Sequence, residues 1–152
     1  MKSLLALIDE LETKLPFIEQ KKKTVSQASV GWHIEHSLLA LIKMVNGVEH
    51  SKPDDYKWKF NFSRYYVLTL GKIPRGRAKV PDSVKPGEEI NISTITPLFE
   101  KARLKAGLFE KLDKKKFLKH PYFGDVHQKQ ARNVIAIHTK HHINIINDII
   151  SG

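Results

Sequence analysis

Two histidines near the C-terminus, His138 and His142, have the spacing of metal ligands on a helix. Residues four positions apart share one helical face, so the two imidazoles are expected to point the same way. The same face also carries a run of apolar residues, namely Ala131, Ile135, Ile145 and Ile149. Burying an imidazole on such a face is costly unless its nitrogens have partners. We therefore expect these two rings to bind a metal ion.

A third ligand is expected from another helix, because a catalytic zinc site usually has three protein ligands and one open position. The segment Gly31-Trp32-His33-Ile34-Glu35-His36-Ser37-Leu38 offers two candidates, His33 and His36. Its helix is apolar on nearly every side, which predicts a central place in a bundle. Helical projection does not choose between the two histidines. His141 lies at the edge of the C-terminal stripe, where it would contact a ligand or face solvent.

The residue types limit the chemistry of such a site. The chain has no cysteine, so any metal ligands must be His, Asp or Glu. An all-imidazole site suits Zn²⁺ or Ni²⁺, with Fe²⁺ or Cu²⁺ as alternatives. Three neutral ligands leave the metal its full charge, which favours activation of a bound water or thiol. No Glu lies between His138 and His142, so a zincin-type peptidase is not expected, and Glu35 is predicted to face solvent.

An acid or base cannot be assigned from the sequence. Weak candidates for a catalytic acid are Tyr65, Tyr66, Tyr122 and His141. Serine-triad and phosphate-loop signatures are absent.

Length and charge set the broad class. The 152 residues, 41% of them hydrophobic, predict one domain over residues 1–152. The net charge of +10 comes from short runs spread over several elements, which does not favour a nucleic-acid partner. The best anion-binding candidate is Lys72–Arg77, with an exposed basic loop as the alternative. No apolar run could span a bilayer, so we expect a cytoplasmic protein without a membrane partner.

Hydrophobic spacing predicts four long amphipathic helices and hence an all-α bundle. The first begins after Ser3 and bends or ends near Pro16. The second opens at Thr24-Val25-Ser26-Gln27, which has the form of a capping box, and runs to Asn46-Gly47. The third starts at Ser93 or Thr94, and the last opens at the capping-box pattern Asp125-Val126-His127-Gln128. Strand signals are poor throughout.

The stretch from His50 to Asn91 is rich in proline and glycine and predicts a long crossover. It includes a short helix over Phe60–Leu70, in which four residues are expected to be partly buried: Tyr65, Tyr66, Leu68 and Leu70. We expect Trp32 and Trp58 to be packing residues. His50 and His127 are expected to be exposed, and His120 to lie in a loop next to Phe123, which closes the end of the bundle.

Three segments resemble the DinB/YfiT-like superfamily of four-helix-bundle metalloproteins. Ser29–Leu38 is similar to the second helix of that family, in which a histidine follows an aliphatic and aromatic run. His120-Pro121-Tyr122-Phe123-Gly124 resembles a loop before the last helix, and His138–His142 looks like the terminal HxxxH. In one departure, Ile143-Asn144-Ile145 stands where many relatives have a glutamine.

The resemblance implies a DinB-like four-helix bundle with a long crossover between its second and third helices. It implies metal ligands at His36, His138 and His142, with His33 and His141 as alternative ligands or as neighbours that contact a ligand. The implied function is that of a metal-dependent enzyme, either a thiol-dependent S-transferase or a small-molecule hydrolase. Its cofactors would be zinc or nickel and a low-molecular-weight thiol, and its partner would be a small-molecule substrate.

Two other functions stay open. One is a catalytically silent DinB-like protein with a structural or ligand-binding role, and the other is a basic nucleic-acid-associated protein. A homodimer is compatible with either.

Overall fold

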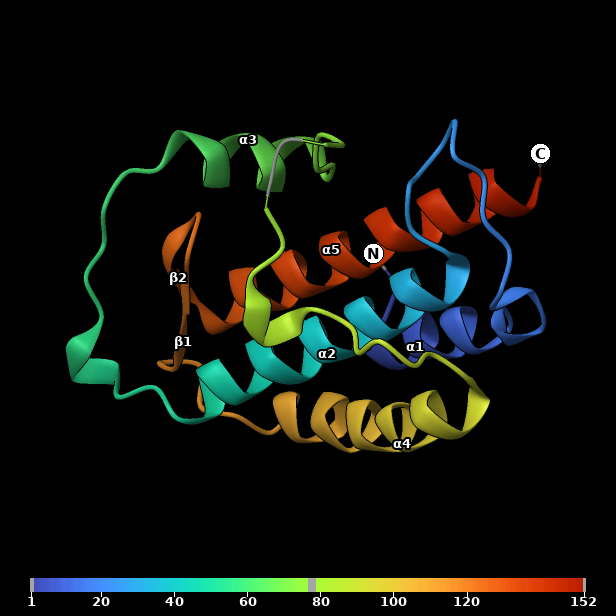
Figure 1. The fold of residues 1–152 in the computed structure, drawn as a ribbon. Helices are drawn as coiled ribbons and strands as arrows, with labels where there is room; N and C mark the ends of the chain where they lie inside the picture. Colours follow the sequence, from blue (N-terminus) through green and yellow to red (C-terminus); the bar gives the residue numbers. More distant parts are fainter. Residues whose placement is uncertain (1, 77–78, 152) are drawn as a thin grey trace.

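The computed structural model describes residues 2–76 and 79–151, and this part of the chain is mostly helical (Figure 1). Its α-helices are α1 (Leu4–Glu12), α2 (Val30–Glu49), α3 (Phe62–Leu70), α4 (Ile92–Phe109) and α5 (Gln128–Ile150). A hairpin of β1 (Phe117–His120) and β2 (Gly124–His127) precedes α5. Short 3-10 turns occur at Leu15–Phe17, Pro53–Asp55 and Asp82–Val84. The prediction of a helical fold is confirmed, with the hairpin as an addition.

Four helices form the hydrophobic core, and α2 is central among them. It packs against both α4 and α5, while α1 packs against the same two helices from another side. The largest side chains that are fully buried come from all four helices and include Leu4, Leu11, Leu38, Phe99, Phe109, Ile135 and Ile146. The expected apolar face of α2 is confirmed, because Val30, Ile34, Leu38, Leu41 and Val45 are all buried. The core therefore fixes α2 and α5 side by side.

The predicted start of α2 was wrong by five residues. Thr24 lies in a turn, and Ser29 caps the helix by accepting a hydrogen bond from the Trp32 amide. The side chain of Ser26 is used elsewhere, because its Oγ lies 2.9 Å from Nε2 of His33. The predicted end at Asn46-Gly47 was also early, since the helix continues to Glu49. By contrast, Ser3 caps α1 as predicted.

The hairpin overturns two expectations. The segment Asp125–Gln128 does not cap α5, because Asp125 and Val126 lie in β2, and α5 begins at Gln128 without a side-chain cap. Asp125 instead accepts a hydrogen bond from the Lys57 amide. His120 lies in β1 and not in a loop, and its Nδ1 accepts the amide hydrogens of Tyr122 and Phe123 in the connecting turn. Short strands with few β-branched residues gave no sequence signal.

The crossover between α2 and α4 carries α3 and the turn Asp82–Val84, which lies against α2 (Figure 1). The short helix was predicted correctly, with Leu68 partly buried. The predicted partial burial of Tyr65, Tyr66 and Leu70 was wrong, because all three are exposed. Trp58, which was expected to be a packing residue, is exposed as well. The inner face of α3 is instead filled by Val67 and by the buried guanidinium of Arg64.

The start of α2 makes a close backbone contact that tolerates no side chain. A Cβ on Gly31 would lie 2.7 Å from Ile18 Cγ1 and 3.0 Å from both the Ile18 carbonyl oxygen and Ile90 Cγ2. The Gly31 amide also donates to that carbonyl at 2.8 Å. The loop before α2 and the end of the crossover are therefore held against the helix at this residue.

We expect Gly31→Ala to lower the free energy of unfolding by about 1–3 kcal/mol, because the added methyl group overpacks this contact. Urea denaturation measures the change. The matched control is Gly107→Ala in α4, where a Cβ meets nothing within 4 Å. That substitution should raise stability by up to about 1 kcal/mol, since alanine has the higher helix propensity. Equal effects at both positions would contradict the steric argument.

Candidate metal centre

Three histidines from two helices converge between α2 and α5. His36 comes from α2, and His138 and His142 come from successive turns of α5. One nitrogen from each ring can be chosen so that all three atoms lie within 4.8 Å of one another. Within residues 2–76 and 79–151, no other group of three or more potential ligands meets this distance. The cluster could therefore hold a metal ion, and it contains the three residues named as ligands above.

His36 is held in one orientation by the crossover. Its Nδ1 lies 2.9 Å from the carbonyl oxygen of Val84, and its ring stacks on Trp32 with centroids 5.0 Å apart. A carbonyl oxygen only accepts, so Nδ1 must carry the hydrogen, and Nε2 keeps its lone pair. This is the usual arrangement of a metal-binding imidazole, in which the second nitrogen donates to a carbonyl and fixes the tautomer.

His142 is oriented in a similar way by a second histidine. Its Nδ1 lies 3.0 Å from Nδ1 of His33, and Nε2 of His33 lies 2.9 Å from the hydroxyl of Ser26. That hydroxyl also accepts the Ala28 amide hydrogen. If His142 donates to His33 and His33 donates to Ser26, both nitrogens of His33 and Nδ1 of His142 have partners, and Nε2 of His142 keeps its lone pair. His33 thus lies beside the cluster as a hydrogen-bond partner, not within it.

His138 supplies the observation that tests whether a metal fits. Its Nδ1 is buried and has no hydrogen-bond partner among the described residues. Leaving such an atom unsatisfied costs about 1–3 kcal/mol. Its ring centroid lies 4.7 Å from that of His142 and 5.1 Å from that of His36. Three largely buried imidazoles, one of which has a nitrogen without a protein partner, are a donor set that fits a divalent metal ion.

Burial keeps the clustered rings neutral. It lowers the pKa of His138 to about 3 and that of His33 to about 4, and neighbouring histidines add to both effects. The pKa values of His36 and His142 are also lowered, mainly by burial. A histidine must be neutral to bind a metal. The rings are therefore in the binding form at neutral pH without first losing protons.

The prediction that Glu35 faces solvent was wrong. Only 7% of this residue is exposed, and its Oε1 accepts a hydrogen bond from the Gly87 amide at 3.1 Å. Together with the bond from His36 to Val84, this contact ties the crossover to α2 at two points. The sequence could not have revealed either contact, because both use backbone atoms that every residue in the crossover carries.

Two cavities lie in very different surroundings. One, of about 190 Å³, is lined by the part of the crossover that follows α3 and by α5, including Lys72, Arg75, Lys140 and His141. It contains part of the predicted anion-binding segment Lys72–Arg77, of which Arg77 lies outside the described residues. The His141 ring centroid lies 5.1 Å from that of His142. His141 is thus the lining residue that relates this cavity to the cluster, although none of the three clustered histidines lines it.

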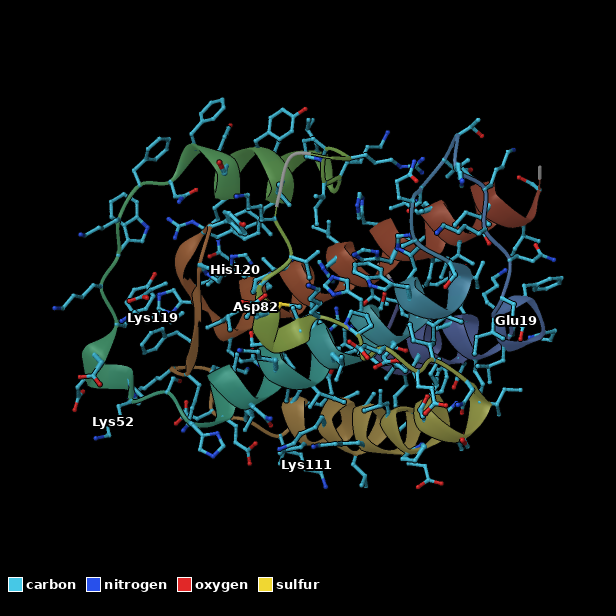
Figure 2. All side chains as sticks on the ribbon, viewed as in Figure 1. Glu19, Lys52, Asp82, Lys111, Lys119 and His120 are labelled. Carbon is cyan, nitrogen blue, oxygen red and sulfur yellow. The ribbon has the colours of Figure 1, made fainter. Side chains whose placement is uncertain are left out.

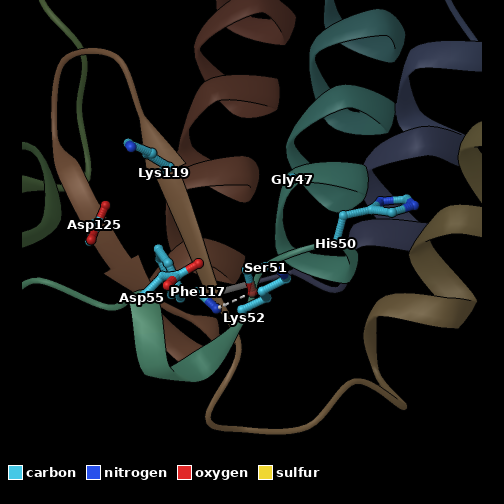
Figure 3. A pocket seen from close by; sticks show the side chains of 8 residues that line it. All are labelled: Gly47, His50, Ser51, Lys52, Asp55, Phe117, Lys119 and Asp125. Atoms are coloured by element: carbon cyan, nitrogen blue, oxygen red, sulfur yellow. Dashed lines mark hydrogen bonds between the residues drawn. The ribbon is translucent and has the colours of Figure 1, made fainter.

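The larger cavity, of about 280 Å³, lies where α2 ends beside the hairpin (Figure 3). It is lined by Gly47, His50, Ser51, Lys52, Asp55, Phe117, Lys119 and Asp125. Figure 3 shows lysine and aspartate side chains around it, and none of the clustered histidines contributes to its wall. We see no arrangement there that would bind a metal or activate a substrate.

Comparison with known proteins finds no matching family model, no matching curated protein and no matching solved structure. The function of the cluster has to be argued from its donor atoms and their surroundings.

Protein treated with a chelator should lose stability as the pH falls from 6.5 toward 4. The buried histidines are neutral when folded, whereas the unfolded chain binds protons at them below about pH 6.5. Each therefore lowers the free energy of unfolding by up to about 1.4 kcal/mol per pH unit, until the pH reaches its folded pKa. The pKa in the folded protein is about 4 for His33 and about 3 for His138.

Urea denaturation at a series of pH values checks this expectation. A free energy of unfolding that stays constant across this range would contradict neutral burial of the cluster.

His33→Ala should weaken metal binding by about 10–100-fold, the usual effect of removing a group that orients a ligand. The three clustered imidazoles would remain, but His142 would lose the partner of its Nδ1. Competition with a chromophoric chelator measures the affinity. His127→Ala is the control, because His127 is exposed and stacks on Tyr56, away from the cluster. If both variants bind as wild type does, His33 does not orient a ligand.

Proposed function

We propose that this protein is a metal-dependent enzyme, in which His36, His138 and His142 bind a divalent ion, most suitably Zn²⁺ or Ni²⁺. The observation that carries the proposal is the convergence of three imidazole nitrogens within 4.8 Å in a buried site. The hydrogen bond at Nδ1 of His36 supports it, because it leaves a lone pair on Nε2 of that ring, and His142 has the same arrangement when it donates to His33. The resemblance of these segments to DinB-like proteins agrees with it.

The proposed reaction is thiol-dependent S-transfer or hydrolysis of a small molecule. A divalent ion held by three neutral ligands lowers the pKa of a bound water or thiol, which produces a nucleophile near neutral pH. The ligand set adds no negative charge that would weaken this effect. A low-molecular-weight thiol is accordingly the second cofactor in the S-transfer form of the proposal.

Among the residues considered as catalytic acids, His141 has the best position. Its ring centroid lies 5.1 Å from that of His142, and its pKa is lowered by burial, so at neutral pH it can accept a proton as a general base rather than donate one as an acid. Tyr122 is less suited, because its hydroxyl donates to the carbonyl of Lys79. Tyr65 and Tyr66 are exposed on α3. We assign proton transfer to His141 as part of the proposal.

Metal content is the first test. Untagged protein purified without chelators should contain close to one equivalent of zinc or nickel, and His138→Ala should contain far less. His50→Ala should keep the metal, because His50 is exposed and caps the far end of α2. Elemental analysis with circular dichroism separates lost binding from lost folding. A folded wild-type protein that takes up neither metal would disprove the enzyme proposal.

Turnover is the second test, with a panel of thiols and electrophiles and a panel of activated esters. We expect metal-loaded wild type to react and His138→Ala to fall to the background rate. His141→Gln should reduce kcat more than KM if His141 transfers a proton in the transition state. Equal rates for wild type and His138→Ala would show that the cluster is not the catalyst.

A further inference from the structure

A large apolar surface covers the outer side of α3 and the segment before it. We name this the α3 patch, and its members are Trp58, Phe60, Phe62, Tyr65, Tyr66 and Leu70. Their exposed fractions range from 41% to 70%. Phe62, Tyr66 and Leu70 follow one another at four-residue spacing and so form a continuous stripe on the helix. A group of exposed aromatic residues of this kind marks an interaction site.

The α3 patch is held outward by the way the helix is anchored. The guanidinium of Arg64 donates to the carbonyls of Lys59, Phe123 and Asp125, at 2.6 to 3.1 Å. Val67 is buried on the same inner side. In Figure 1 α3 lies at the edge of the molecule, on the side away from α4, and Figure 2 shows side chains on its outer surface pointing away from the other helices. The patch is thus a convex ridge on a fixed element.

Positive charge surrounds the α3 patch. Residues 56–81 contain no Asp or Glu, and their basic residues are Lys57, Lys59, Arg64, Lys72, Arg75, Arg77 and Lys79. Lys57, Lys59 and Lys72 are exposed beside the aromatic residues. A partner that covers the patch must therefore be both apolar and negatively charged. A second copy of this chain fits poorly, because each copy has a net charge of +10 and the same basic border.

We propose that the α3 patch binds the surface of a membrane that contains anionic phospholipids. A short helix lying in the interface buries aromatic and aliphatic side chains at the acyl boundary, while flanking lysines contact the headgroups. Trp and Tyr favour this region because their rings have an apolar body and a polar edge. Among the described residues no helix is long and apolar enough to cross a membrane. The association is therefore peripheral.

Single-stranded nucleic acid is less well matched to the same surface. Arginine would be the natural phosphate contact, but Arg64 is used by three carbonyls and Arg75 pairs with Asp148 at 2.7 Å. Leu70 offers no ring on which a base could stack.

Membrane binding would bring the cavity beside His141 close to the lipid surface. Gly71 ends α3 in a left-handed conformation, and both Gly71 and Lys72 line that cavity. This inference does not depend on the proposed reaction, because the α3 patch and the histidine cluster share no residue.

Vesicle flotation tests the proposal with full-length protein. Wild type should float with vesicles of phosphatidylcholine containing about 30% phosphatidylglycerol, and binding should weaken at high salt. Vesicles of phosphatidylcholine alone should bind less protein, by a factor of about ten or more. The double variant with Phe62→Ser and Tyr66→Ser should bind these vesicles about tenfold more weakly or worse, because it loses two apolar rings of the α3 patch. Both rings are exposed, so their loss should leave the fold intact. Trp58 fluorescence should shift to the blue on binding.

Leu104→Ser is the matched control, because Leu104 is 75% exposed on α4, away from the α3 patch. It should bind vesicles as wild type does. Equal loss in this variant, or equal binding to neutral vesicles, would overturn the proposal. Two other results would also overturn it. One is a wild-type dimer in solution that Phe62→Ser converts to monomer. The other is that the protein binds no vesicles but binds single-stranded RNA in a salt-dependent way that the same variants abolish.

Discussion

The constraint on which this structure depends is the burial of imidazole rings between α2 and α5. Water reaches these rings poorly, so their nitrogens must find partners within the protein or in something it binds. Among the described residues, three of the four buried histidines, His33, His36 and His142, have such partners, whereas His138 Nδ1 has none. His36 and His142 are paired at Nδ1, and His33 is paired at both nitrogens. The packing of α2 against α5 therefore also determines which hydrogen-bond partners the buried histidines have.

The need of buried polar groups for hydrogen-bond partners also determines the path of the crossover. Its backbone supplies the carbonyl of Val84 to His36, while the Gly87 amide donates to the buried Glu35 carboxylate. Without these contacts, two polar side chains of α2 would be buried with fewer partners. The loop before α2 has a comparable role, because Ser26 ends the hydrogen-bond series that begins at His142, and Gly31 allows close approach at Ile18. Long irregular segments are thus ordered by polar contacts and not by core burial alone.

The sequence predicted the helices well and their polar contacts poorly, for physical reasons. Apolar spacing identified the helices, and the i, i+4 histidines indicated a shared face. Projection could not separate His33 from His36, because the difference depends on partners from distant segments, including the Ser26 hydroxyl and the Val84 carbonyl. The expectation that Ser26 belonged to a capping box failed for the same reason. Tyr65 and Tyr66 were expected to be partly buried because aromatic residues usually are, whereas the anchoring of α3 by Arg64 turns them outward.

Buried polar atoms that have no hydrogen-bond partner lower the stability of the folded protein in the absence of a ligand. Three side-chain atoms, His138 Nδ1, Glu35 Oε2 and Asn46 Oδ1, are buried without a hydrogen-bond partner among the described residues. Native proteins contain few such atoms, and each one calls for an explanation. A metal ion at the cluster would satisfy His138, and its binding free energy would add directly to the stability of the folded state. The more tightly a metal ion is bound there, the more the folded, metal-bound form is favoured over the free one.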